Sequence, residues 1–166
     1  MSVIKVTGMS CGYRGRPDVL EDINLELDDP GLVCIIGPNG VGKSTLVKCL
    51  TGSIKPSEGE VSILGKKVSD YKLKDLAKIV GYVPVTSSDH NNLTVAETVL
   101  VGRFARQGMR TSSKDLQAAY RALKALEIED LAGRGFNELS AGQHQKVAIA
   151  RGLVQQTRIL ILDEPT

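Results

Sequence analysis

Hydrophobic and polar residues alternate near the amino terminus of the chain. Apolar residues at positions 23, 25 and 27 are separated by polar residues at 24, 26 and 28, and residues 3–7 show a similar pattern. A repeat of two residues is typical of a strand that buries one face. The sequence therefore predicts an antiparallel sheet in this part of the chain.

Residues 31–37, GLVCIIG, form an apolar run without alternation, which predicts a strand that is buried on both faces. A glycine-rich turn follows this run. The next residues predict a helix from about Lys43 to Thr51, with Gly52 as its stop signal.

The rest of the chain predicts strands and helices in alternation. Strands are expected over residues 60–65, 81–84 and 159–162. Helices are expected over 73–79 and 94–128, because apolar residues recur there at helical spacings. These apolar residues are Leu73, Leu76, Ala77, Ile79, Leu116, Ala119, Leu123 and Leu126. The order indicates an α/β core joined to antiparallel strands and a helical insert.

Composition narrows the class of protein. The chain has 166 residues, 42% of them hydrophobic, and a net charge of +2, so we expect one core and no nucleic-acid partner. Three cysteines, an odd number, favour free thiols in a reducing compartment. No apolar stretch is long enough to span a membrane, and the N-terminus lacks a signal-peptide layout. We therefore expect a cytoplasmic protein that contacts a membrane only through a partner.

Residues 37–44, GPNGVGKS, match the phosphate-binding pattern GxxxxGK[ST] between a predicted strand and a predicted helix. Gly40 and Gly42 are the positions where we expect positive φ angles, which let backbone N–H groups surround a phosphate. Lys43 is expected to reach the β- and γ-phosphates and Ser44 to ligate Mg²⁺. The alternative is a glycine turn that only starts a helix. The residues expected to bind the nucleotide here are Gly37, Pro38, Asn39, Gly40, Val41, Gly42, Lys43, Ser44 and Thr45.

Two further motifs follow in the chain: LSAGQ at residues 139–143 and ILILDEPT at 159–166. With the phosphate loop, in this order, they resemble the ATP-binding cassette family along the whole chain, with LSAGQ a mild departure from the commoner LSGGQ. The resemblance implies an α/β P-loop NTPase fold, mainly of parallel strands, with an N-terminal antiparallel β subdomain and a helical signature subdomain. It divides residues 1–166 into a core at about 1–85, a helical part at about 86–150 and a final strand at about 151–166.

The resemblance also assigns roles to residues near the carboxyl end. Two cassettes stack head to tail in the family, so Ser140, Gly142 and Gln143 are expected to meet the nucleotide that the partner's phosphate loop holds. An ordinary helix cap is the alternative for Ser140. Asp163 is expected to hold Mg²⁺ through water, and Glu164 to act as the general base, with Lys43 as the other catalytic residue.

Tyr13 occupies the place where family members carry an aromatic residue that stacks on adenine. A plain loop aromatic is the alternative. His90 and His144 are expected to have no chemical role. Val85 departs from the family, which usually has glutamine there as a contact to Mg²⁺ and water. An apolar side chain cannot ligate a hard cation, so metal binding would depend on Ser44 and Asp163.

The resemblance implies an ATPase subunit that powers solute transport, with import favoured because residues 91–103 resemble metal-chelate and cobalamin importers. Its expected partners are transmembrane permease subunits, contacted through residues 86–113, and a second ATPase subunit at the inner face of the membrane. We expect the domain to be incomplete at its carboxyl end, where the family continues with a strand and a histidine, and residues 1–166 alone to be inactive. A non-catalytic nucleotide-binding module and a non-transport ATPase of the same family remain as alternatives.

Overall fold

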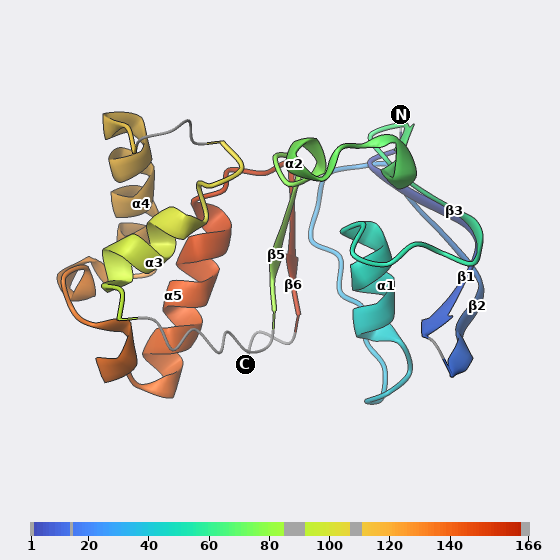
Figure 1. The fold of residues 1–166 in the computed structure, drawn as a ribbon, viewed down its shortest axis with the longest axis horizontal. Helices are drawn as coiled ribbons and strands as arrows, with labels where there is room; N and C mark the ends of the chain where they lie inside the picture. Colours follow the sequence, from blue (N-terminus) through green and yellow to red (C-terminus); the bar gives the residue numbers. More distant parts are fainter. Residues whose placement is uncertain (1, 14, 85–91, 107–110, 164–166) are drawn as a thin grey trace. The chain divides into compact units, whose positions relative to one another are not determined.

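The computed structural model describes residues 2–13, 15–84, 92–106 and 111–163, and it consists of two compact units, residues 1–76 and 77–166 (Figure 1). Each unit has its own sheet and its own helices. The division of the chain at about residues 85 and 150 by function stays a prediction.

The first unit is built on a four-stranded antiparallel sheet in the order β2-β1-β3-β4. Its strands are β1 (Ile4–Tyr13), β2 (Arg16–Leu27), β3 (Glu58–Ile63) and β4 (Lys66–Lys67). The predicted antiparallel sheet is therefore confirmed. Side chains along β1 alternate between buried and less buried positions from Ile4 to Cys11, with an irregularity at Gly8, where φ is 54°.

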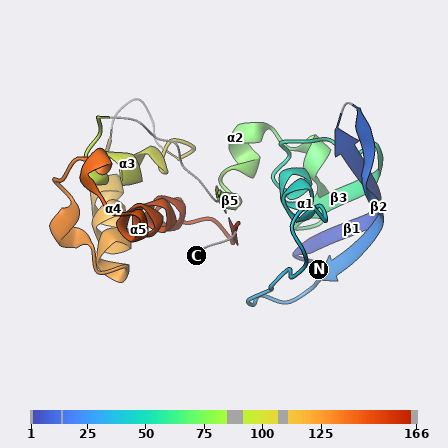
Figure 2. The same ribbon diagram turned by 90° about the horizontal axis from the view of Figure 1, so that it is seen from below.

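Helix α1 (Lys43–Leu50) lies beside this sheet and contacts β2 and β3 (Figure 2). The predicted helix is confirmed, and its last residues are followed by Gly52 at a φ of 70°. The apolar side of α1 is buried, while Met9 and Ile63 of the sheet and Cys49 of the helix are completely enclosed. A short 3-10 turn, η1 (Val68–Asp70), and the short helix α2 (Leu73–Leu76) complete the unit.

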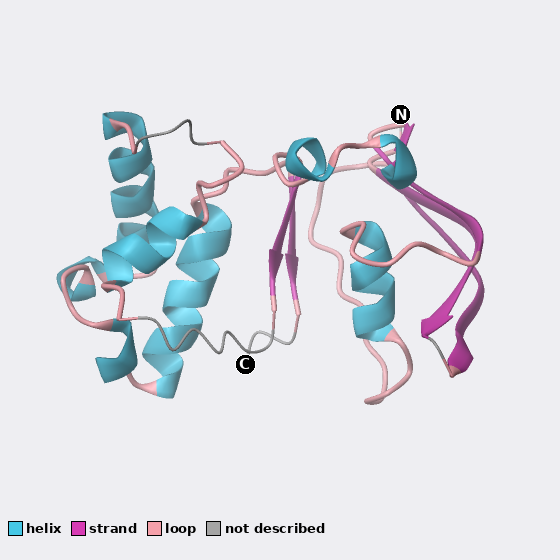
Figure 3. Cartoon of the chain, viewed as in Figure 1, coloured by secondary structure: helices cyan, strands magenta, loops and turns pink. Residues whose placement is uncertain are grey.

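The predicted buried strand at residues 31–37 is wrong for this structure. Figure 3 shows the chain between β2 and α1 as loop, and no strand pairs with it in the part of the chain that is described. Leu32 and Ile36 are 94% and 92% exposed. An apolar run favours burial, but a strand also needs a neighbour to accept and donate its backbone hydrogen bonds, and none of the described strands pairs with this segment.

The second unit holds a parallel pair of strands, β5 (Val80–Val83) and β6 (Ile159–Leu162), as the apolar patterns at these positions predict. Its helices are α3 (Val95–Val101), α4 (Ser113–Ala125) and α5 (Ala141–Leu153), with 3-10 turns η2 (Glu129–Leu131) and η3 (Phe136–Glu138). The three helices contact one another around a core in which Val95, Val99 and Val147 are fully buried. Helix α5 also contacts both strands.

Two predicted helices differ from the observed ones. The helix expected over residues 73–79 is only one turn, because the chain leaves the helix after Leu76 and becomes a strand at Val80. Leu73, expected on the apolar face of this helix, is 71% exposed. The helical pattern over 94–128 is divided into α3 and α4, since Thr94 and Ser112 each start a new helix with a capping box. Leu116 is more than half exposed, and the buried face of α4 consists of smaller residues around Ala119 and Leu123. None of the described helices has the length and hydrophobicity that crossing a bilayer requires.

Candidate nucleotide-binding site

The phosphate loop connects the exposed segment after β2 to helix α1 in the first unit. Gly40 and Gly42 have φ angles of 79° and 105°, so the prediction that these two glycines adopt positive φ is confirmed. Gly42 is the N-cap of α1 and supplies no side-chain cap. A Cβ atom at Gly42 would lie 2.6 Å from Cδ2 of Leu20, so both backbone conformation and space require glycine there.

Lys43 folds back over this loop. Its Nζ atom donates hydrogen bonds to the carbonyl oxygens of Gly37 at 2.7 Å and Pro38 at 3.1 Å. Ser44 and Thr45 follow in the first turn of α1, where backbone N–H groups have no partner within the helix. Asn39 and Val41 complete the same loop. The loop thus combines one ammonium group with a helix amino terminus, and both features favour an anion.

Tyr13 lies at the end of β1 and contacts α1. Its hydroxyl shares a hydrogen bond with the hydroxyl of Thr45 at 3.2 Å and accepts one from Nζ of Lys48 at 3.2 Å. These hydrogen bonds, of which the one to Thr45 has the larger effect, lower the pKa of Tyr13. The residue is 41% exposed, and Nζ of Lys48 lies 5.3 Å from the centroid of its ring. Tyr13 is therefore fixed to the helix of the phosphate loop while part of its ring stays accessible.

Ser140 is the N-cap of α5 in the second unit. Its hydroxyl accepts a hydrogen bond from the backbone N–H of Gln143 at 3.3 Å, and the side chain of Gln143 accepts one from the N–H of Ser140 at 2.9 Å. The structure thus contains the ordinary helix cap that the sequence offers as an alternative. Gly142 lies in the same turn, and a Cβ atom there would meet nothing within 4 Å. His144 contacts the carbonyl oxygen of Phe136 at 2.8 Å through Nε2 and packs against the ring of Phe136.

Asp163 follows the last residue of β6. Its backbone N–H donates to the carbonyl oxygen of Val83 at 3.0 Å, and its Oδ2 atom accepts a hydrogen bond from the hydroxyl of Tyr82 at 3.1 Å. Burial, and after it the adjacent carboxylate of Asp163, raises the pKa of Tyr82, so the phenol is a hydrogen-bond donor at neutral pH. Glu164, Val85 and His90 lie outside the described residues.

Comparison with known proteins identifies the family. The sequence profile of the family described as "ABC transporter" matches residues 20–166. The chain belongs to the ABC transporter family. An uncharacterised ABC transporter ATP-binding protein of Methanocaldococcus jannaschii is 41% identical over 166 residues, which cover 100% of this chain and 65% of the relative. A probable siderophore transport system ATP-binding protein of Bacillus subtilis is 38% identical over 168 residues, covering 100% of this chain and 61% of the relative.

A solved structure supports the same assignment. An ATP-binding cassette in a dimeric, post-hydrolysis state bound to ADP and Pi is 32% identical to this chain, with a TM-score of 0.85 over 98% of the chain and 74% of that cassette. The α/β fold of a P-loop ATPase cassette, inferred from the three motifs, is therefore confirmed. The chain spans less than two thirds of the length of each of the two curated relatives above.

Sequence analysis missed two arginines that connect elements of the second unit. Arg103 is 9% exposed and donates from Nε to Oδ1 of Asp115 at 2.8 Å and from Nη1 to the carbonyl oxygen of Val154 at 3.1 Å. Arg106 donates to the carbonyl oxygens of Lys78, Gln155 and Gln156. The two side chains thus join the segment after α3 to the end of α5 and the start of β5. Their position directly after an apolar helix is the sequence feature that could have drawn attention to Arg103 and Arg106.

Tyr82 was also missed, although it lies in the strand GYVP that sequence analysis identified. Strand pairing places Tyr82 opposite Ile161, two residues before Asp163. Because side chains alternate along a strand, a residue two positions before the acid lies on the same face. This relation could have been predicted only if the pairing of the two strands and its register had been known.

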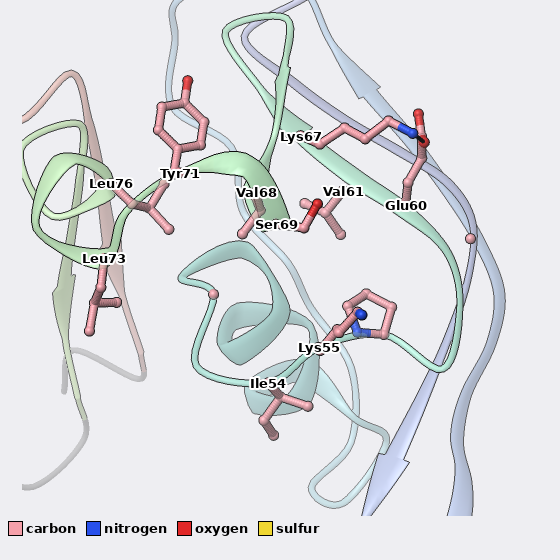
Figure 4. Close-up of a pocket in the computed structure, with 13 residues that line it drawn as sticks. Ile54, Lys55, Glu60, Val61, Lys67, Val68, Ser69, Tyr71, Leu73 and Leu76 are labelled. Atoms are coloured by element: carbon pink, nitrogen blue, oxygen red, sulfur yellow. Dashed lines mark ion pairs between the residues drawn. The ribbon is translucent and has the colours of Figure 1, made fainter.

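A cavity of about 350 Å³ in the first unit is separate from the phosphate loop (Figure 4). Its lining includes Val61 and Leu76, which are buried, and polar side chains at its edge. Several of those polar groups are paired within the protein: Lys67 with Glu60, the hydroxyl of Ser69 with Asp70, and the hydroxyl of Tyr71 with the backbone of β3. These side chains are therefore engaged with the protein itself, and the cavity carries no functional assignment.

Proposed function

We propose that this chain supplies the ATP and Mg²⁺ site of an ATPase subunit that, paired head to tail with a second copy, hydrolyses ATP to drive solute import through membrane permease subunits. The observation that carries the proposal is the phosphate loop, in which Gly40 and Gly42 adopt left-handed conformations directly before Lys43 at the start of α1. A loop of this geometry directs backbone N–H groups at phosphate oxygens.

Lys43 is the catalytic cation in this proposal. Its ammonium group bonds to two carbonyl oxygens of the loop, and it would exchange them for the β- and γ-phosphates of ATP. Charged hydrogen bonds of this kind contribute about 1.5–3 kcal/mol each. The other loop residues, from Gly37 to Thr45, would bind the phosphates mainly through their backbone. The exposed ring of Tyr13 would stack on the base, held by its bonds to Thr45 and Lys48.

The donor atoms available for a cation are of the right chemical type. Mg²⁺ takes oxygen ligands, and the resemblance to the family assigns this role to the hydroxyl of Ser44 and the carboxylate of Asp163, each of which has the required donor atom. When bound, the cation would neutralise charge on the phosphate oxygens. Glu164, next to Asp163, would accept a proton from the attacking water. With valine at position 85, these two oxygen donors would hold the metal without the amide that the family usually provides.

Ser140, Gly142 and Gln143 would serve a second chain. The amino terminus of α5 is capped by its own serine and carries no acidic residue in its first turn, so it is suited to approach an anion. In a head-to-tail dimer this helix end would face the γ-phosphate that the partner holds. The similar cassette that is dimeric with ADP and Pi bound supports the pairing of two copies.

The direction of transport and the solute class are inferred from relatives. One relative is named for siderophore transport, which supports import of a metal chelate. Permease subunits would then hold the ATPase at the inner face of the cell membrane, with contacts through residues 86–113.

A non-catalytic nucleotide-binding module is the second candidate function, since Val85 replaces a side chain that the family uses to contact the metal ion and water.

Calorimetry and turnover in the full-length polypeptide test the proposal. Lys43→Ala should weaken ATP binding by about ten- to a hundredfold, because it removes the charged hydrogen bonds to the phosphates. Lys55→Ala, which removes the same charge from an exposed position outside the loop, is the matched control and should leave binding unchanged. Unchanged affinity in Lys43→Ala with an intact fold would contradict the phosphate-site assignment.

Glu164→Gln separates the two candidate functions. An ATPase should keep its affinity for ATP in this variant and lose turnover, because the general base is gone while the phosphate loop is intact. A protein that shows no turnover before the substitution, although it binds ATP, is the non-catalytic module.

A further inference from the structure

The side chain of Asp163 is held by a partner on the neighbouring strand. Residues 80–83 pair with residues 159–162 in parallel, so Tyr82 lies opposite Ile161. Alternation along the strands then places Tyr82, Ile161 and Asp163 on one face of the pair. The hydroxyl of Tyr82 donates to Oδ2 of Asp163 at 3.1 Å across this face.

The opposite face of the same strands is occupied by α5. Atoms of Val83 and Leu160 lie close to Gly152 of that helix, where an added Cβ would come within 2.5 Å of Val83 and 3.2 Å of Leu160. Helix α5 contacts both strands, so this packing sets the position of the strand pair. The position of Tyr82 follows from it, because its backbone belongs to the strand that α5 supports.

Asp163 is held by fewer contacts than the strand pair itself. Its backbone is fixed by the bond from its N–H to the carbonyl oxygen of Val83 at 3.0 Å. Among the described residues its carboxylate accepts one hydrogen bond, the one from Tyr82, which engages Oδ2. A carboxylate at the end of a strand rotates about two side-chain bonds, and a single donor from a fixed neighbour is enough to restrict that rotation.

We propose that Tyr82 is a positioning residue that holds Oδ2 of Asp163 and thereby fixes the orientation of the carboxylate that would bind the metal ion. The inference rests on the proposed function, in which Asp163 binds Mg²⁺ through water. It assigns a role to Tyr82 beyond the packing of β5.

The test is the affinity of Mn²⁺, followed by its electron paramagnetic resonance, for the full-length polypeptide saturated with a non-hydrolysable ATP analogue. Tyr82→Phe removes one oxygen atom and keeps the ring. We expect Mn²⁺ to bind about tenfold more weakly, at the lower end of what the loss of such a supporting hydrogen bond costs. Affinity for the ATP analogue in the presence of a chelator should not change, because Tyr82 contacts no group assigned to the nucleotide.

Tyr71→Phe is the matched control. It removes the same atom from a tyrosine whose hydroxyl donates to the carbonyl oxygen of Ile63 in the other unit. Mn²⁺ affinity equal to that of the unaltered protein is expected for this variant. If Tyr71→Phe weakened Mn²⁺ binding as much as Tyr82→Phe, the effect would be a general loss of stability, and the positioning role would be refuted.

Asp163→Ala distinguishes failure of this inference from failure of the proposed function. If Asp163→Ala leaves Mn²⁺ affinity unchanged, the metal assignment in the proposed function is wrong, and the inference falls with it. If Asp163→Ala weakens Mn²⁺ binding but Tyr82→Phe does not, only the positioning role is refuted. If Tyr82 acts through Asp163, the double variant should bind Mn²⁺ no more weakly than Asp163→Ala alone.

Discussion

Gly142→Ala should stabilise the fold and impair ATP hydrolysis at the same time. Gly142 lies in the first turn of α5, between the cap residue Ser140 and its partner Gln143. A Cβ atom at this position meets nothing within 4 Å in the chain itself, and its φ is not in the left-handed region. The substitution therefore introduces no strain and no internal contact.

The magnitude follows from this geometry. Alanine is favoured over glycine in a helix by about 0.5–1 kcal/mol, because glycine loses more backbone freedom when it folds. In a chain of this size, about 1 kcal/mol corresponds to about 2–4 °C in Tm. Since Gly142 is in the first turn, we expect the lower half of these ranges. Urea unfolding of the full-length polypeptide measures the change.

The expected loss of activity comes from the second chain. In the proposed head-to-tail arrangement the backbone of Gly142 would approach the γ-phosphate on the partner, and a methyl group would hold the two apart. A displacement of about 1 Å from the productive geometry can lower a rate by on the order of a hundredfold. Turnover should therefore fall strongly, whereas ATP affinity of the monomer should stay the same.

Gly133→Ala is the control, because Gly133 also has open space around its Cβ position and lies outside the predicted site. That variant should keep full turnover. If Gly142→Ala is stabilised and hydrolyses ATP at the unaltered rate, the first turn of α5 does not approach the partner's phosphate, and the role given to Gly142 is refuted.

Two further predictions concern Tyr13 and Asp115. Tyr13→Ala should weaken ATP binding by about 1–3 kcal/mol, because base stacking is lost. Tyr13→Phe keeps the ring and should bind ATP, measured by calorimetry, almost as tightly as the unaltered protein. Equal losses of affinity in both variants would mean that the hydroxyl contact with Thr45, and not stacking, supports binding. Hydrogen bonds from the side chain and backbone of Ser112, and then from Arg103, lower the pKa of Asp115 from 3.8 to about 2. Its ionised form therefore stabilises the folded state fully above pH 3.8, and this contribution is lost as the pH falls to about 2. Urea unfolding midpoints should consequently fall less steeply with acid in Asp115→Asn than in the unaltered protein; identical slopes would contradict the assignment.

Local patterns were sufficient for much of the fold. The alternation around Ile23 and the short apolar runs predicted as strands at 81–84 and 159–162 each depend on neighbouring residues, and each corresponds to an observed strand. The capping boxes at Thr94 and Ser112 are equally local, but the single helix expected over residues 94–128 overlooked them. The glycine conformations of the phosphate loop were predictable for the same reason, because a tight turn before a helix restricts φ locally.

Predictions that require a second element of the same chain to pack or pair with the segment were less reliable. The apolar segment at 31–37 has the composition of a buried strand, yet none of the described residues pairs with it. Leu73 has a helical spacing to Leu76, but a short helix that ends in a strand leaves it exposed. An apolar side chain is suited to burial, but it is buried only if another element of the fold packs against it.

The sequence by itself determined the family and the candidate chemistry. The phosphate loop, LSAGQ and the acid pair are contiguous motifs, and their residue types indicate their chemistry without knowledge of the fold. Only the tertiary structure decided which side chains support them. The contact of Tyr13 with Thr45, the pair of Arg103 and Asp115, and the bond from Tyr82 to Asp163 each join residues from different parts of the chain. Contacts of that kind depend on strand register and helix packing, which no local pattern encodes.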